Sequence, residues 1–141
     1  MKIFNLIILL GMFSFILANE AALVKKLKGN AHIVREGKEL AIGVGTKVLE
    51  KDKIITQASS SVGLIFKDNT RISVGSNSEF TVEEYMFNLS EKKEVFTTNL
   101  SKGSLECVTG LISKINPKAF QLKAKTATMG IRGTHFIVDV N

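Results

Sequence analysis

The fold is decided by the stretch Val62–Val74, which reads VGLIFKDNTRISV. Apolar side chains alternate with small or polar ones on both sides of its centre, which is the period of a β-strand with one buried face. The central Lys67–Thr70 contains Asp and Asn, which accept local backbone hydrogen bonds and tolerate left-handed conformations. The stretch therefore predicts a β-hairpin with a tight turn.

Strand signals continue outward from this hairpin. Alternating patterns recur at Ala31–Val34, Phe80–Val82, Phe120–Ala124 and Thr134–Val140. Short strands separated by Gly, Asn and Asp turns are typical of a sandwich, barrel or β-solenoid, while the absence of a strict repeat speaks against identical solenoid rungs. We predict an all-β, single domain of short antiparallel strands in a solenoid-like or sandwich-like arrangement.

Two segments depart from this pattern. Met86–Lys102 carries mixed charges, which fits either a long charged hairpin or a partly mobile loop, with Val95–Thr98 as a strand inside it. Glu20–Lys26 is predicted to form one helical turn. Beyond the first residues, no stretch holds a 3.6-residue apolar period, so longer helices are not expected.

Residues 3–17 are almost wholly apolar and follow Lys2, and small Ala18 comes next. A positive start, an apolar run and a small residue form the layout of a signal peptide, and the run is shorter than the roughly 20 residues of a spanning helix. We predict a signal-peptide helix at 1–18, cleavage after Ala18 and a β domain at 27–141. The alternative is a retained membrane anchor, because Ile16 is larger than the residue usual three positions before a cut.

The net charge is +6, and the loss of Lys2 with the leader would leave +5. The lysines are scattered and interleaved with Glu and Asp, so we expect a solvated basic surface and no nucleic-acid partner. The single cysteine excludes an internal disulfide, so burial must hold the core. The leader predicts a location in the periplasm or outside the cell, where disulfides are permitted but not required.

The residues that could carry chemistry are few. Cys107 lies at an apolar strand phase, which predicts a buried small hydrophobe rather than a nucleophile. His32 and His135 occupy polar strand phases, and two histidines with one cysteine fall short of a zinc set. Glu83–Glu84 fits acidic residues at a strand end better than paired catalytic carboxylates. We therefore expect no enzymatic activity, no cofactor and no metal.

The segment Gly130–Thr134 has the look of a glycine-rich phosphate loop, but it lacks the Lys-Ser/Thr ending and the following helix. It runs into a strand instead, so we expect its glycines to allow close backbone packing. Arg132 would form an ion pair or bind loop carbonyls. We predict a structural role for Arg132 and Gly133, and Gly133→Val should lower the thermal stability or prevent folding.

These last residues carry a family resemblance. Lys125–Val140, KTATMGIRGTHFIVDV, resembles the closing motif of FecR-type domains, in which V/I-R-G-T leads into an alternating strand. Gly45–Thr56, the Val62–Thr70 hairpin, Ile72–Phe80 and the Gly103 segment resemble earlier family blocks in the right order. One departure is Lys51, where the family usually has Gly before Asp52, so the shape of that turn is in question.

The resemblance implies an all-β fold and the periplasmic interaction module of regulators that relay a signal to a sigma factor. We expect the module alone to carry over, because the chain shows no cytoplasmic arm, membrane span or further periplasmic subdomain. Its partner would be a protein or a cell-envelope polymer, with membrane contact only if the leader is kept. The family-motif residues, expected to be structural, are Asp52, Thr56, Asp68, Gly130, Arg132, Gly133 and Thr134.

Two alternatives remain. One is a ligand-binding or enzymatic β-domain that acts on envelope polysaccharide, although the lack of Trp and the single Tyr85 make a poor sugar-stacking platform. The other is a structural role in which basic residues touch anionic lipid or peptidoglycan; salt-independent sedimentation with envelope fractions would exclude it.

Overall fold

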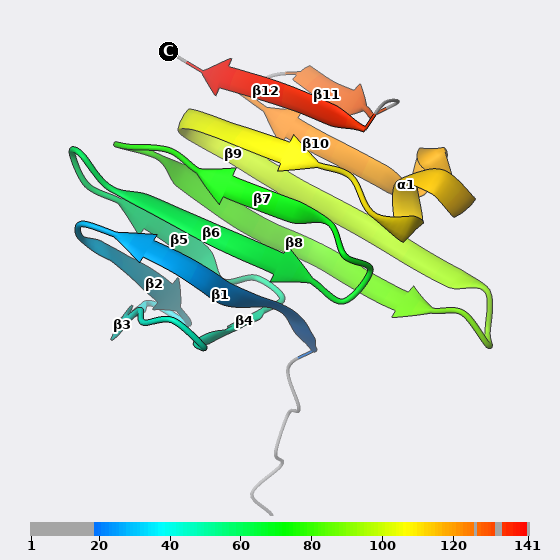
Figure 1. Ribbon diagram of the computed structural model, residues 1–141, viewed down its shortest axis with the longest axis horizontal. Coiled ribbons are helices and arrows are strands. Elements are labelled where there is room, and N and C mark those ends of the chain that lie inside the picture. Colours follow the sequence, from blue (N-terminus) through cyan, green and yellow to red (C-terminus); the bar gives the residue numbers. More distant parts are fainter. Residues whose placement is uncertain (1–18, 126, 132–133, 141) are drawn as a thin grey trace, which may run out of the picture.

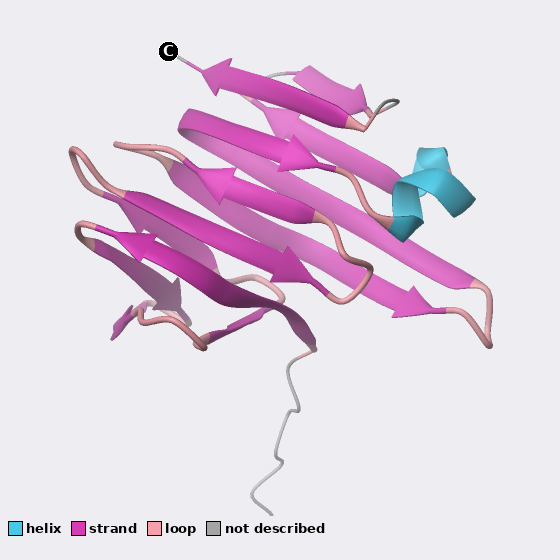
Figure 2. Ribbon diagram, in the orientation of Figure 1, coloured by secondary structure: helices cyan, strands magenta, loops and turns pink. Residues whose placement is uncertain are grey.

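The computed structural model describes residues 19–125, 127–131 and 134–140. Its strands form one curled sheet whose two halves face each other as layers (Figures 1 and 2). The arrangement is therefore all-β and sandwich-like. The predicted leader, residues 1–18, lies outside the described residues. Within the described residues, no helix is long and apolar enough to cross a membrane.

The first layer contains six strands in the spatial order β4-β1-β6-β7-β9-β12. Every pair in it is antiparallel. Apart from β9, its strands are β1 (Glu20–Lys28), β4 (Lys47–Leu49), β6 (Ser61–Phe66), β7 (Arg71–Val74) and β12 (His135–Val140).

The second layer has the order β3-β2-β5-β8-β9-β10-β11. Its β9–β10 pair is parallel, which departs from the antiparallel arrangement predicted. Apart from β9, its strands are β2 (Ala31–Arg35), β3 (Lys38–Ala41), β5 (Lys53–Thr56), β8 (Glu79–Asn88), β10 (Phe120–Ala124) and β11 (Ala127–Gly130).

Strand β9 (Lys93–Val108) belongs to both layers and joins them. Its first half pairs with β8, and its second half pairs with β7 and β12 after the strand bends over (Figure 1). Gly103 lies at the bend with a φ of 87°, in the left-handed region that favours glycine. A Cβ there would overlap Ser78, so the strand can change layer only at a residue without a side chain.

The core fills the space between the layers. Alternate residues point inward, as in β6 and β10, which confirms the strand phases read from the sequence. A row of rings crosses the core from one layer to the other: Phe66 and Phe96 lie 4.6 Å apart, and Phe96 and Phe120 stack at 4.4 Å between centroids. Such pairs contribute about 0.5–1.5 kcal/mol beyond their burial.

The structure settles two local predictions. Glu20–Lys26 is part of strand β1 and not a helical turn, because a strand buries Ala22 and Val24 while pairing with β6. The described sheet thus begins at Glu20. Of the two structures predicted for Met86–Lys102, the long hairpin is the one observed: β8 and β9 remain paired as far as Asn88 and Lys93.

A short helix was not predicted. Helix α1 (Leu111–Ile115) and the 3-10 turn η1 (Pro117–Ala119) connect β9 to β10. Parallel neighbours need such a crossover, because a tight turn can only join antiparallel strands. Five residues are too few to show a helical period in the sequence.

Candidate functional site: motif residues, a cavity and an open sheet edge

Asp52 is buried and paired with Arg35. The Arg35 Nε and Nη2 donate to the two carboxylate oxygens at 2.8 and 2.7 Å, and the Leu49 amide donates to the same carboxylate at 2.8 Å. The hydrogen bond to Asp52 raises the pKa of Arg35, against the opposing effect of desolvation. The bidentate pair therefore ties β2 to the turn between β4 and β5.

That turn contains the departure from the family pattern. Lys51 has a φ of 70°, so it takes the left-handed conformation that a glycine would adopt at little cost. Lys51 thus keeps the backbone conformation that suits the glycine usual in the family at this position.

Thr56 connects two turns at one end of the layers. Its hydroxyl donates to the Gly75 carbonyl at 2.5 Å and accepts from the Ser78 amide at 2.9 Å. Ser78 in turn accepts from the Ser104 amide at 3.0 Å, next to the bend of β9. These bonds give Thr56 a structural position, since they hold the turn between β7 and β8 against the bend of β9.

Asp68 is fully buried at the turn of the β6–β7 hairpin, although a turn aspartate is usually solvated. One carboxylate oxygen accepts from the Tyr85 hydroxyl at 3.0 Å and from the Thr70 amide at 3.2 Å. The other accepts from the Thr70 hydroxyl at 2.7 Å and the Ile112 amide at 3.0 Å. We call Asp68, Thr70, Tyr85 and the residues 110–112 the Asp68 cluster.

The Asp68 cluster also explains why residue 110 is a glycine. Gly110 donates from its amide to the Thr70 hydroxyl at 3.0 Å. A Cβ at Gly110 would overlap the Asp68 carbonyl oxygen and the Thr70 nitrogen. The chain therefore approaches the hairpin turn more closely than any side chain permits.

Burial shifts two neighbouring groups toward their neutral forms. Desolvation raises the pKa of Tyr85 far above its ordinary value, and the Asp68 charge adds to this. The same two causes, burial first, raise the pKa of the Cys107 thiol from 9.0 to about 12. Cys107 is thus a buried thiol that resists ionisation, which is the opposite of an activated nucleophile.

The remaining candidates for chemistry are paired on the surface. Imidazole Nε2 atoms lie 3.6 Å from Glu39 for His32 and 2.7 Å from Glu106 for His135. Glu83 binds Lys123 at 2.8 Å on the outer face of the second layer. Its neighbour Glu84 is exposed beside a bulge in β8. Within the described residues, no three His, Cys, Asp or Glu side chains gather to hold a metal ion.

The closing motif is only partly described. Arg132 and Gly133 lie outside the described residues. Gly130 ends β11, and a Cβ there would meet no atom of the described residues within 4 Å, so these residues show no close packing at this glycine. Thr134 is exposed, and its carbonyl accepts from the Thr109 amide at 2.9 Å.

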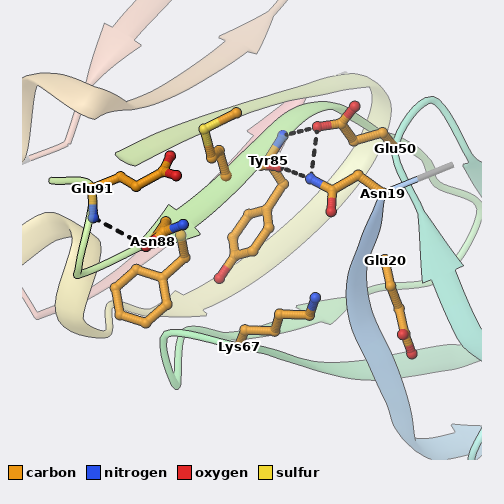
Figure 3. A pocket seen from close by; sticks show the side chains of 9 residues that line it. Asn19, Glu20, Glu50, Lys67, Tyr85, Asn88 and Glu91 are labelled. Atoms are coloured by element: carbon orange, nitrogen blue, oxygen red, sulfur yellow. Dashed lines mark hydrogen bonds between the residues drawn. The ribbon is translucent and has the colours of Figure 1, made fainter. Parts of the chain in front are cut away.

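A cavity of about 470 Å³ opens where β1 begins and β8 ends (Figure 3). Three glutamates line it, and each already has a partner. Glu50 accepts from the Tyr85 amide at 2.9 Å, Glu20 lies 3.8 Å from Lys47, and Glu91 lies 3.6 Å from Lys93. The sequence offered no signal for this cavity, because its lining comes from four separate segments: Asn19–Glu20, Glu50, Lys67, and Tyr85–Asn88 with Glu91.

Strand β12 forms one side of the first layer. It pairs with β9 from His135 to Val140, and no described strand pairs with its other edge. Ile137 is 70% exposed, while Phe136 and Val138 are half-buried against the core. Within the part of the chain described, β12 therefore presents an unpaired row of backbone donors and acceptors beside incompletely covered apolar side chains.

Comparisons with known proteins identify the family of this chain. No curated protein sequence matches it. One solved structure, described as "Cell surface anchoring domain", is similar with 26% identity over 43% of this chain and 82% of that chain, at a TM-score of 0.42. The family model described as "FecR protein" matches residues 52–141. That match spans more than half of the sequence and includes Asp52, Asp68 and the closing motif. The chain belongs to the FecR protein family.

Proposed function

We propose that this protein is a non-enzymatic interaction module of the cell envelope, working outside the cytoplasm, whose β12 edge accepts a strand from a protein partner. The open edge of β12 carries the proposal. A partner strand added there would gain main-chain hydrogen bonds, and its alternate side chains would meet the flank of the core.

The chemistry of β12 supports this role. Edge strands that avoid partners are usually blunted by Lys, Pro or a bulge. The six residues HFIVDV contain no Lys or Pro and one carboxylate, that of Asp139, and their pairing with β9 runs without a shift in register. Exposed Ile137 lies in the middle of the edge, where an added strand would cover it.

The placement of the polar groups supports a role in binding rather than catalysis. A general acid or base needs a group that can reach a substrate with a matched proton affinity. Cys107 and Asp68 are buried inside the core, and the glutamates around the cavity are engaged by backbone or lysine. The polar groups described in the core therefore contribute to the fold.

The test is photo-crosslinking in intact cells, with a photoreactive amino acid at Ile137 and, as a control, at Val44. The control matches because Val44 is 71% exposed and also apolar, but lies in the loop before β4. We expect a discrete crosslinked product from position 137 and none from position 44. Equal labelling at both positions, or none at 137, would contradict a binding edge.

The cavity favours a second candidate, binding or cleavage of envelope polysaccharide, because three glutamates line one opening. Glycoside hydrolysis uses two carboxyl groups across the scissile bond. Incubation with peptidoglycan and assay for released reducing ends separates the two functions. Release that Glu50→Gln or Glu91→Gln abolishes would establish the second candidate, and unchanged polymer would exclude cleavage.

A further inference from the structure

We infer that the strand accepted at the β12 edge comes from a second copy of this chain, so that two β12 strands pair antiparallel about a two-fold axis at Ile137. This inference rests on the proposed function, since it uses the same edge. The first layers of the two copies would join into one continuous sheet, and the interface would be isologous.

The sequence of β12 is complementary to itself in this register. With Ile137 opposite its own copy, His135 faces Asp139 of the other strand, and symmetry forms this pair twice. Both side chains stand on the solvent side of the layer, since β12 alternates between exposed and half-buried residues. An imidazole opposite a carboxylate is a favourable cross-strand pair, whereas like charges there would repel.

Other registers lose this match. A one-residue slip would turn every side chain of the second strand to the wrong face. Centring the axis on Phe136 would place His135 opposite Ile137, and centring it on Val138 would place Ile137 opposite Asp139. Of these registers, the one centred on Ile137 is thus the one that pairs His135 with Asp139 and the apolar side chains with one another.

The inner side of the strand supports the same pairing. Phe136 packs edge-on against Phe120 of the second layer, with ring centroids 6.3 Å apart at 89°, and remains half-buried. In the two-fold register, Phe136 faces Val138 of the other copy, so an aromatic and a β-branched side chain cover each other. The core of each copy would then continue across the axis.

On the outer face of the first layer, the half-exposed His135 side chain is accessible to Asp139 of the second copy. His135 already contacts Glu106 of β9 at 2.7 Å, and both side chains are about half exposed. Asp139 of the other strand would approach the imidazole from the side away from β9. The histidine would then lie between two carboxylates, one from its own chain and one from its partner.

The register is tested with Ile137→Cys in the full chain under mild oxidation. Cβ atoms of directly opposite residues lie about 4.5–5.5 Å apart, and a small shift of the two edge strands brings them to the roughly 3.5–4.5 Å that a disulfide needs. We expect a disulfide-linked dimer from Ile137→Cys and none from Val44→Cys. The native Cys107 does not compete, because it is buried.

The charges are tested by exchange. Asp139→Lys alone sets lysine opposite histidine, and His135→Glu alone sets glutamate opposite aspartate, so each variant should dissociate at a protein concentration at least tenfold higher than the wild type. Mixing the two variants restores attraction in both pairs, and a heterodimer should form. Sedimentation velocity over a concentration series measures this, with circular dichroism to show that each variant folds.

A chain that stays monomeric, or a dimer unaffected by both charge variants, would overturn the inference. If position 137 then still crosslinks to a different protein, the proposed function stands and only the identity of its partner changes. If position 137 crosslinks to nothing, both fail.

Discussion

The hairpin turn that holds Asp68 and the edge strand β12 belong to the same layer, but their polar groups are satisfied to opposite degrees. Both oxygens of the Asp68 carboxylate are occupied by donors from the hairpin, from β8 and from helix α1. The β12 edge has no pairing strand among the described residues. A buried charge is tolerated only when its partners are fixed, whereas an exposed edge tolerates change and stays available for binding.

This difference predicts that equal substitutions will have unequal effects in the two regions. The largest effect should come from Gly110→Ala, because the new Cβ would overlap backbone atoms of Asp68 and Thr70. Backbone cannot move aside as a flexible side chain can, so we expect a loss of about 3 kcal/mol or more of unfolding free energy, or no folding. Chemical denaturation followed by circular dichroism measures it.

The matched control for Gly110→Ala is Gly130→Ala near the open edges, where a Cβ meets no atom of the described residues within 4 Å. That variant should change the free energy of unfolding by less than about 0.5 kcal/mol. Similar losses from both glycine variants would show that close approach at residue 110 is not what the fold requires.

Asp68→Ala should have the second largest effect. It would leave the Tyr85 hydroxyl, the Thr70 hydroxyl and the Ile112 amide without their acceptor inside the core. Unsatisfied buried donors cost about 1–3 kcal/mol each, so we expect a loss of roughly 3 kcal/mol or more in urea unfolding. Asp139→Ala on the exposed face of β12 should lose less than about 0.5 kcal/mol when unfolding is measured at a protein concentration below that at which the chain dimerises; an equal loss would refute the contrast.

Alkaline pH should weaken the core around Asp68 while leaving the edge unaffected. The pKa of Cys107 is raised from 9.0 to about 12, so its stabilising effect is complete below pH 9 and is lost as the pH rises toward 12. The unfolded thiol then binds fewer protons than the folded one. The free energy of unfolding should therefore fall by about 1.4 kcal/mol per pH unit because of Cys107. Tyr85, whose pKa is also raised, adds to this loss once the pH exceeds the ordinary pKa of a tyrosine, 10.0.

Thermal unfolding between pH 8 and 11 measures this slope. Cys107→Ala should unfold with a shallower pH dependence than the wild type, even though the variant is less stable at pH 8. His135→Asn on the exposed strand should leave the alkaline slope unchanged. A slope that survives Cys107→Ala and Tyr85→Phe together would assign it to other groups.

The smallest expected effect is a gain in stability, from the removal of a buried polar group that has no described partner. The hydroxyl of Thr98 is buried in β9 and has no hydrogen-bond partner among the described residues. Thr98→Val removes this unpaired group and keeps the branched shape, so we expect a gain of about 1 kcal/mol. Thr97→Val, next to it on the outer face, is the control and should change little; a destabilised Thr98→Val would mean that the hydroxyl is paired after all.

Much of the fold could be predicted from local pattern. The alternation in Val62–Val74 predicted the β6–β7 hairpin, and Asn69 at its turn has the left-handed φ of 68° that turn chemistry requires. The polar phases of His32 and His135 and the buried phase of Cys107 were read from the same period of two. The family resemblance, resting on blocks in order, agrees with the family match.

The candidate sites could not be predicted from local side-chain alternation. The partners of Asp68 lie 17 and 44 residues away, at Tyr85 and Ile112, and nothing near Asp68 in the sequence indicates them. The cavity likewise gathers its lining from distant turns. Glu20–Lys26 was misread because a short apolar-polar segment gains its strand geometry from pairing with β6 and not from its own residues.

The sequence by itself determined the strands and turns of this protein, because side-chain alternation and the backbone preferences of Asn and Gly act between neighbouring residues. Only the tertiary structure decided that β9 bends at Gly103 to serve both layers, that Asp68 is enclosed, and that β12 is left at the edge. These depend on which strands meet across the sheet, and such meetings are selected by the packing of the whole core rather than by any single segment.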